Sequence, residues 1–311
     1  MNESRDILQY LHYHPLSSRG DITAGTAFKG SDATLKRVIA AGIKAGDIVA
    51  EGKARATRYR LSPQAQLLMP LNLDTYFALE VDERQVHSSY NFELINGLLA
   101  ETRLFSDKEQ AHLDALQDEF RQHVNELTDN EYRKEMERLG IDLSWKSSQI
   151  EGNTYTLLET ERLLRESKTA EGKTKEEAVM LLNHKDALSF ILDNPDYLKE
   201  LTVSHIEDIH QLLTKDLSID KGLRRHRVGI TGTNYHPLDN EFQIREAMRD
   251  ACKLINSKYN IFEKALLTLL LLSYIQPFSD GNKRTARITS NAILIANNYC
   301  PLSFRSVDSI D

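Results

Sequence analysis

The sequence predicts a mainly α-helical protein with two domains. At 311 residues, the chain is long enough to form two hydrophobic cores. Apolar residues recur at the three- and four-residue spacing of amphipathic helices through much of the sequence, and strands are expected in only two short regions. Charge also changes along the chain, since residues 1–62 hold 10 Lys and Arg against 6 Asp and Glu, whereas the remainder holds 29 against 40. A basic module therefore precedes an acidic one.

The basic module, residues 1–62, combines helices with a strand pair. Its predicted elements are a helix at 4–13, a short second element at 18–27, a longer helix that Ser31 caps and that ends near residue 45, and strands at 48–50 and 57–61 around a basic turn. This order resembles a winged helix-turn-helix, which is a small winged-helix (α+β) domain.

Double-stranded DNA is the partner that this resemblance suggests. The longer helix would enter a major groove, and the basic turn of the wing would meet phosphates. The candidate DNA contacts are Lys36, Arg37, Lys53, Arg55 and Arg58. Winged helices also mediate protein contacts, so both kinds of partner remain open.

Residues 63–74 are expected to form a linker, because prolines and polar residues replace the periodic pattern there. The second domain, residues 75–311, begins with a long helical region that includes 92–104 and 109–127. Residues 307–311 suggest the start of a further helix.

The most informative stretch, residues 276–287, follows an apolar run at 265–275 that predicts a buried helix. Gly281 allows a tight turn, after which the N–H groups of Asn282 and Lys283 would converge on an anion at a helix N-terminus. Arg284 and Arg287 are three residues apart and would share one helical face, where guanidinium groups bind phosphate oxygens. The stretch therefore predicts a site for the phosphates of a nucleotide.

A magnesium ion fits the same loop. Asp280 lies at its mouth, and Mg²⁺ usually binds one or two carboxylates together with substrate phosphate oxygens. Asp280 is therefore the candidate Mg²⁺ ligand.

The stretch resembles the signature of the Fic (AMPylator) family, H-P-F-x-[DE]-G-N-[GK]-R-x-x-R, at every fixed position except the first. The resemblance implies an all-α Fic domain with a β-hairpin flap. It also implies an adenylyltransferase that uses ATP with Mg²⁺ and transfers AMP to a hydroxyl of a target protein. The family includes self-modifying and homo-oligomeric members, so a second copy of this chain is a candidate partner beside an unidentified protein.

Gln276 stands where the family has its general-base histidine. A carboxamide has no protonation equilibrium near neutral pH, so it can orient a hydroxyl but cannot take its proton. Three interpretations follow: a nucleotide-binding site with weak or lost transfer, altered chemistry with another phosphate-containing group, and a scaffold without activity.

A second motif, Ser147 to Asn153, matches the family's inhibitory signature [ST]-x-x-x-E-[GN] within a helical segment around 143–153. Ser147 leads it, Glu151 is the acid, and Gly152 and Asn153 follow. The resemblance implies that Glu151 pairs with Arg287 and keeps the γ-phosphate from binding productively. Downstream, Thr156 and Glu159 form a capping box that predicts a new helix.

Residues 222–237 are rich in Gly and β-branched residues and predict a β-hairpin. It resembles the family's flap, whose strand edge binds an extended segment of the target. The predicted docking residues are Val228, Ile230, Thr231 and Gly232.

Apolar runs and cysteine content indicate the cellular environment expected for the protein. The run at 265–275 is too short to cross a bilayer, so no membrane partner is expected. Two cysteines give no disulfide framework, which suits a reducing cytoplasm.

Overall fold

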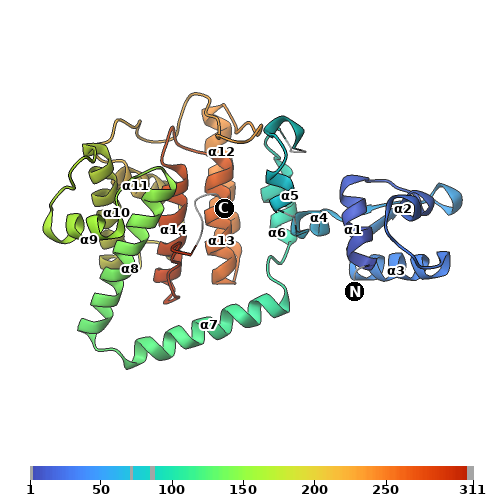
Figure 1. The fold of residues 1–311 in the computed structure, drawn as a ribbon, viewed down its shortest axis with the longest axis horizontal. Coiled ribbons are helices and arrows are strands. Elements are labelled where there is room, and N and C mark those ends of the chain that lie inside the picture. Colours follow the sequence, from blue (N-terminus) through green and yellow to red (C-terminus); the bar gives the residue numbers. More distant parts are fainter. Residues whose placement is uncertain (1–2, 71–72, 85–87, 307–311) are drawn as a thin grey trace. The chain divides into compact units, whose positions relative to one another are not determined.

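The computed structural model describes residues 3–70, 73–84 and 88–306, and the chain divides into two compact units, Met1–Arg84 and Gln85–Asp311 (Figure 1). Most described residues lie in helices, so the predicted mainly α-helical fold is confirmed. The division after Arg84 comes later than the predicted linker at 63–74. The helix start predicted at 307–311 lies outside the described residues.

Unit 1, residues 1–84, is built on three helices followed by a two-stranded antiparallel sheet. Its elements are α1 (Glu3–Tyr13), α2 (Arg19–Gly25), α3 (Asp32–Ala45), β1 (Ile48–Glu51), η1 (Ala54–Ala56), β2 (Arg58–Leu61), α4 (Pro63–Leu68), α5 (Leu73–Phe77) and η2 (Val81–Glu83). Ser18 and Ser31 cap α2 and α3, since each side chain accepts a main-chain N–H of the first turn. Leu35 and Ile39 of α3 join the buried core of the unit.

The segment predicted as a linker begins with helix α4. Ser62 is its N-cap, because the hydroxyl accepts the N–H of Ala65, and Pro63 occupies the first turn, where a missing N–H costs nothing. Ala65 and Met69 pack against the core of unit 1. This part of the chain therefore belongs to the first unit.

Unit 2, residues 85–311, is helical throughout its described elements. They are η3 (Leu94–Leu98), α6 (Leu99–Glu101), α7 (Asp107–Glu126), α8 (Asp129–Ile150), α9 (Leu157–Glu166), α10 (Lys175–Asp193), α11 (Val203–Leu213), α12 (Glu241–Ser257), α13 (Ile261–Ile275) and α14 (Asn282–Ala296). The predicted capping box of Thr156 and Glu159 starts α9. No helix in the described part of the chain is long and apolar enough to cross a membrane.

Helix α14 is the centre of unit 2. It packs against α13 on one side and against α8, α10 and α11 on the other (Figure 1). Residues Arg284 to Leu294 are all buried, so this helix carries polar side chains into the interior. The apolar helix α13 covers it, as the run at 265–275 predicts.

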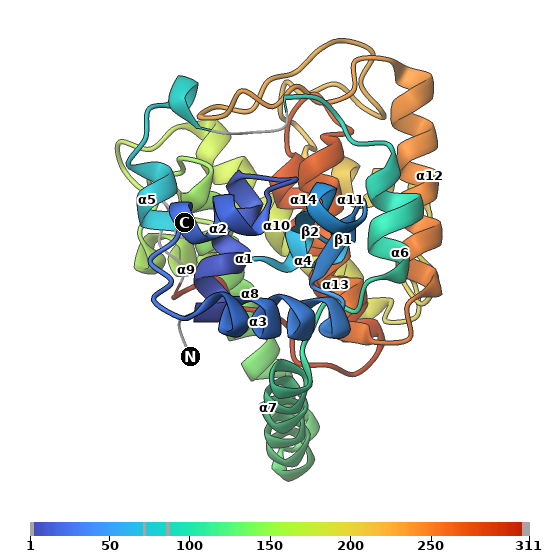
Figure 2. The same ribbon diagram turned by 90° about the vertical axis from the view of Figure 1, so that its right-hand side faces the viewer.

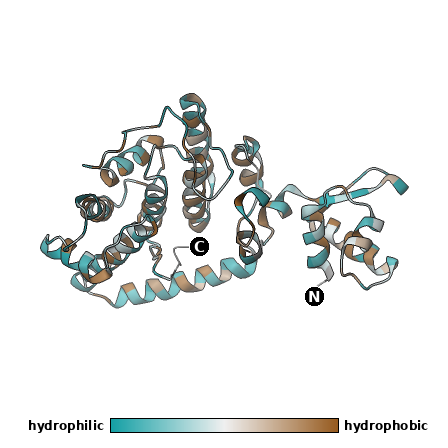
Figure 3. Cartoon of the chain, turned by 45° about the horizontal axis from the view of Figure 1, so that its top comes forward, coloured by the Kyte–Doolittle hydropathy of each residue, from teal (hydrophilic) through white to brown (hydrophobic). Residues whose placement is uncertain are grey.

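The long helix α7 extends away from the other helices of unit 2 (Figures 1 and 2). Most of its length is hydrophilic (Figure 3). Gln117 is its buried anchor, since this side chain donates to the carbonyl of Asn298 and accepts the N–H of Cys300.

The flap differs from the predicted hairpin. Among the described residues the only sheet is β1–β2, and residues 222–237 form a loop with a turn at Gly232 and one isolated bridge between His236 and Ser89. Pro237 has no N–H to give to a ladder, and a two-stranded hairpin is only marginally stable by itself. The segment is held by other elements instead, for example by the Tyr235 hydroxyl, which donates to the carbonyl of Tyr274 at 3.0 Å.

Candidate nucleotide-binding site

The loop between α13 and α14 begins at Gln276. This residue ends α13 in the left-handed conformation (φ 51°, ψ 60°), and its main-chain N–H donates to the carbonyl of Leu272. The side-chain amide donates to the carbonyl of Ser273 at 2.7 Å. Gln276 therefore caps its own helix, and its carboxamide is bound to the last turn of α13.

Asn282 closes the loop into a tight turn. Its Oδ1 accepts the N–H of Phe278 at 2.8 Å, and its Nδ2 donates to the carbonyl of the same residue at 2.9 Å. Gly281 has φ +79°, a conformation that glycine adopts without strain. The asparagine side chain thus shapes the loop, while its N–H group stays at the start of α14.

Arg284 is the buried cation of this helix start, with 2% of the residue exposed. Its Nη2 lies 3.4 Å from the carboxylate of Asp280, whose side chain is 67% exposed. Nε and Nη1 of Arg284 are buried and have no hydrogen-bond partner among the described residues. The first turn of α14 has no side-chain cap, whereas Lys283 is exposed beside it. Buried N–H groups and an uncapped helix N-terminus together favour an anion.

His210 on α11 supports this loop, and sequence reasoning missed it. Its ring stacks on Phe278 with 3.8 Å between centroids, and Nε2 donates to the carbonyl of Asp280 at 3.0 Å. Burial lowers the pKa of His210 to about 4, so the ring is neutral at pH 7. A histidine in an ordinary amphipathic helix gives no sequence signal of such a contact.

Asp280 is the residue of this loop that could hold a metal. Its Oδ1 accepts the N–H of Gly281 at 2.6 Å, and the carboxylate is otherwise largely exposed. In the described part of the chain, no three His, Cys, Asp or Glu side chains gather closely enough to hold a metal ion. One carboxylate at the mouth of an anion site fits Mg²⁺ bound mainly by phosphate oxygens and water.

Glu151 and Arg287 lie together, although 136 residues separate them in sequence. Nη2 of Arg287 is 2.6 Å from Oε1 of Glu151, and the same guanidinium donates to the hydroxyl of Ser147 at 2.8 Å and to its carbonyl at 3.0 Å. Burial lowers the pKa of Arg287, and the Glu151 carboxylate opposes that shift. Arginine nevertheless stays charged, so the pair is an ion pair between α14 and the end of α8.

The turn after Glu151 is fixed by helix α10. Gly152 has φ +90°, Asn153 donates to the carbonyl of Glu177 at 2.9 Å, and the N–H of Thr154 donates to the Glu177 carboxylate at 2.7 Å. The predicted motif residues Gly152 and Asn153 therefore help to position Glu151.

The predicted docking residues Val228, Ile230, Thr231 and Gly232 lie in the flap loop. Arg224, at the beginning of this loop, is 2% exposed and was missed by sequence reasoning. Its main-chain N–H donates to the carbonyl of Pro277 at 3.0 Å, which attaches the flap to the loop between α13 and α14.

In unit 1, the candidate DNA contacts are exposed. Lys53 and Arg55 lie at the turn between β1 and β2, and Arg37 lies on α3. Lys36 forms an ion pair with Asp32 at 2.8 Å. Arg58 donates to the carbonyl of Thr57 next to it.

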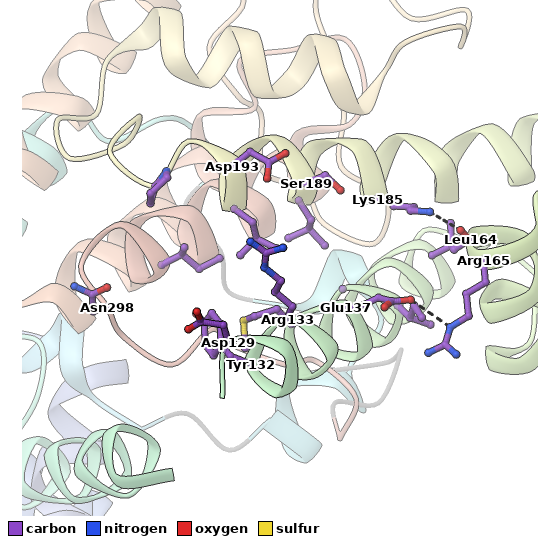
Figure 4. A pocket seen from close by; sticks show the side chains of 17 residues that line it. Asp129, Tyr132, Arg133, Glu137, Leu164, Arg165, Lys185, Ser189, Asp193 and Asn298 are labelled. Atoms are coloured by element: carbon purple, nitrogen blue, oxygen red, sulfur yellow. Dashed lines mark hydrogen bonds and ion pairs between the residues drawn. The ribbon is translucent and has the colours of Figure 1, made fainter. Parts of the chain in front are cut away.

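A groove of about 670 Å³ lies elsewhere in unit 2, between α8, α9, α10 and the end of α14 (Figure 4). Arg165 pairs with Glu137 at its edge, and Lys185 donates to the carbonyl of Leu164. Among the described residues, its lining includes none of the predicted site residues.

Part of unit 2 matches a family of known proteins. Residues 200–294 match the family model described as "Fic/DOC family", and the chain contains a Fic/DOC family domain. It is similar to "Protein adenylyltransferase Fic" of Drosophila willistoni, 28% identical over 159 residues, which cover 49% of this chain and 31% of the relative. The protein of the same name from Nematostella vectensis is 30% identical over 173 residues, which cover 54% of this chain and 40% of the relative. The matches thus span less than half the length of these curated relatives.

Two solved structures show the fold. A Fic domain containing signaling protein from Bacteroides thetaiotaomicron has a TM-score of 0.53 and 21% identity, covering 61% of this chain and 74% of that one. A segment of Fic-1 from C. elegans has a TM-score of 0.52 and 24% identity, and the match covers 62% of this chain and 58% of that one.

Proposed function

We propose that this chain binds ATP with Mg²⁺ at the N-terminus of α14, that Glu151 autoinhibits the site, and that AMP transfer to protein hydroxyls is weak or lost. One observation carries the proposal: Arg284 is buried, and two of its nitrogens lack partners among the described residues, next to an uncapped helix start. Leaving buried N–H groups unpaired costs about 1–3 kcal/mol, which a bound phosphate would offset.

Arg284 and Arg287 supply the charge for a polyphosphate. Both guanidinium groups are buried on one face of α14, and the counter-charges beside them are Asp280 and Glu151. A guanidinium cannot serve a carboxylate and a phosphate oxygen in the same geometry. Glu151 therefore competes with the phosphate that would bind Arg287.

Gln276 limits the chemistry of the site. Without a general base, the target hydroxyl keeps its proton, and such a loss typically lowers the rate about 10²–10⁴-fold. Phosphate positioning by Arg284 and the α14 N-terminus is independent of residue 276. The expected outcome is a nucleotide binder with impaired adenylyl transfer.

Asp280 would hold the Mg²⁺ ion, which neutralises phosphate charge when bound. The flap loop would receive the target, which is an unidentified protein or a second copy of this chain. Both cysteines are free thiols, which supports a reducing compartment such as the cytoplasm.

Unit 1 supports a second candidate function, a DNA-binding regulator in which the Fic domain is a scaffold. Its order of three helices and a hairpin, with exposed Lys53 and Arg55 at the hairpin turn, resembles that of a winged helix-turn-helix. Retardation of genomic DNA fragments at low salt that disappears in Lys53→Ala/Arg55→Ala would support it. No retardation at any salt concentration would contradict it.

The test of the proposed chemistry is transfer of labelled AMP from ATP·Mg²⁺ to the protein itself. We compare Glu151→Gly with Glu151→Gly/Gln276→His, using Glu151→Gly/Gln276→Asn as the matched control without an imidazole. Label in the histidine variant alone supports an intact site that lacks only its base. Equal label in all three would show that Gln276 allows turnover. No label together with no ATP binding would contradict the proposal and favour the scaffold.

A further inference from the structure

The hydroxyl of Ser147 lies between two buried side chains from two other helices. Nε2 of His184 on α10 is 2.9 Å from Ser147 Oγ, and Nε of Arg287 on α14 is 2.8 Å from the same atom. His184 and Ser147 are fully buried. Helices α8, α10 and α14 therefore meet at one hydroxyl group, four residues before Glu151.

The direction of each hydrogen bond follows from the groups involved. The other ring nitrogen of His184, Nδ1, faces the carbonyl of Met180 at 3.3 Å, and a carbonyl only accepts, so Nδ1 carries the proton. Nε2 of the neutral ring is then an acceptor, and Ser147 Oγ donates to it. The lone pairs of Oγ are left to accept the N–H of Arg287.

The surroundings keep the ring neutral. Burial, together with the nearby charges of Arg284 and Arg287, lowers the pKa of His184 to about 3. A protonated ring would carry a hydrogen on Nε2 and could not accept the Ser147 hydroxyl.

We infer that His184 is a positioning residue of the inhibitory contact: it fixes the Ser147 hydroxyl so that Arg287 is held facing Glu151. The inference rests on the proposed function, because it concerns the regulation of the same site.

The geometry explains how this would strengthen inhibition. Arg287 uses Nε for the Ser147 hydroxyl and Nη2 for the Ser147 carbonyl and Glu151. The Nε–Nη2 edge is one of the edges with which a guanidinium binds an oxyanion through two parallel bonds. With this edge held against α8, a phosphate must displace Ser147 as well as Glu151. Removing the His184 acceptor frees the hydroxyl to rotate, which loosens the hold on Arg287.

Calorimetric titration with ATP·Mg²⁺ tests the inference. His184→Leu removes the acceptor, whereas His184→Gln keeps an amide oxygen that can accept the Ser147 hydroxyl. We expect His184→Leu to bind ATP several-fold more tightly than the unmodified protein and His184→Gln to remain near it. In the Glu151→Gly background, His184→Leu should add nothing, because the inhibitory contact is already absent. Unchanged ATP affinity in His184→Leu would overturn the inference. An equal change in ATP affinity on His184→Leu with and without Glu151 would also overturn it.

A second readout is independent of ATP. In ¹⁵N spectra of the unmodified protein, His184 should be the Nδ1–H tautomer, and the Arg287 Nε–H signal should be protected from exchange. That protection should persist in His184→Gln and disappear in His184→Leu and Ser147→Ala. The Nε2–H tautomer in the unmodified protein would overturn the inference even if the leucine variant failed to fold. If Glu151→Gly does not bind ATP, the proposed function fails, and these spectra still decide whether His184 positions Arg287.

Discussion

Arg224 binds the main chain of Gln276, with Nε donating to its carbonyl oxygen at 2.6 Å. The same guanidinium donates to the carbonyl of His226 at 2.8 Å and to that of Leu238. One buried side chain therefore joins the loop after α13 to both ends of the flap. Because these bonds involve main-chain atoms of residue 276, a Gln276→His replacement keeps the anchor intact.

Replacing Arg224 with Met should destabilise unit 2 and loosen the flap. Three carbonyl groups would lose a charged donor, and unpaired buried groups cost about 1–3 kcal/mol each before relaxation and water entry. We expect the free energy of unfolding in urea to fall by about 2–4 kcal/mol. Hydrogen exchange should accelerate across 225–238. The adjacent Arg225→Met is the matched control, since that side chain is 81% exposed and should change stability little.

Arg284 should stabilise the complex with ATP but lower the free energy of unfolding of the protein without ligand. Its Nε and Nη1 have no partner within the described ranges, so Arg284→Met removes unpaired buried donors and fills the space with apolar atoms. We expect the unfolding free energy without ligand to rise by about 1–3 kcal/mol, while ATP binding is lost. Arg249→Met, an exposed position on α12, should change neither quantity. A large loss of stability in Arg284→Met would contradict this account.

Glu177 should make stability depend on acid pH. Hydrogen bonds from the Thr154 hydroxyl and the Thr174 main chain, with further bonds from the same two residues, lower the pKa of Glu177 from 4.5 to about 2. Its stabilisation is therefore complete above pH 4.5 and is lost as the pH falls toward 2. Glu177→Gln should reduce the free energy of unfolding at pH 7 and flatten its decline between pH 4.5 and 2. The neighbouring exposed Glu176→Gln should leave the pH profile of unfolding unchanged.

Local chemistry made much of the fold predictable. Ser31 and Thr156 cap helices as predicted, and Gly281 is the N-cap of α14. These features were predictable because each depends on residues only a few positions apart. The loop conformation of the flap was not predictable in this way, since strand pairing depends on a partner segment and Pro237 lacks an N–H. Helix α4 was missed because prolines suggested a linker, although Pro63 after Ser62 is also a helix start.

Residues of the candidate site could be predicted only where they belong to one of the two sequence motifs. Arg287 and Glu151 lie together as the two motifs imply, yet Arg224, His184 and His210 act through contacts with segments that are distant in sequence. None of the three belongs to a local pattern. Their roles depend on tertiary packing around α14, which periodicity does not specify.

Titration of ATP·Mg²⁺ into the unmodified protein and into Glu151→Gly tests the central claim most directly. Glu171→Gly is the control, because Glu171 is exposed. The double variant Glu151→Gly/Arg284→Ala confirms the location of the site. Since Arg287 is held by Glu151 at 2.6 Å, removing that carboxylate should increase the affinity about tenfold or more. The control should match the unmodified protein, and the double variant should not bind. Equal affinity in the unmodified protein and Glu151→Gly, or binding that persists without Arg284, would contradict an autoinhibited nucleotide site at α14.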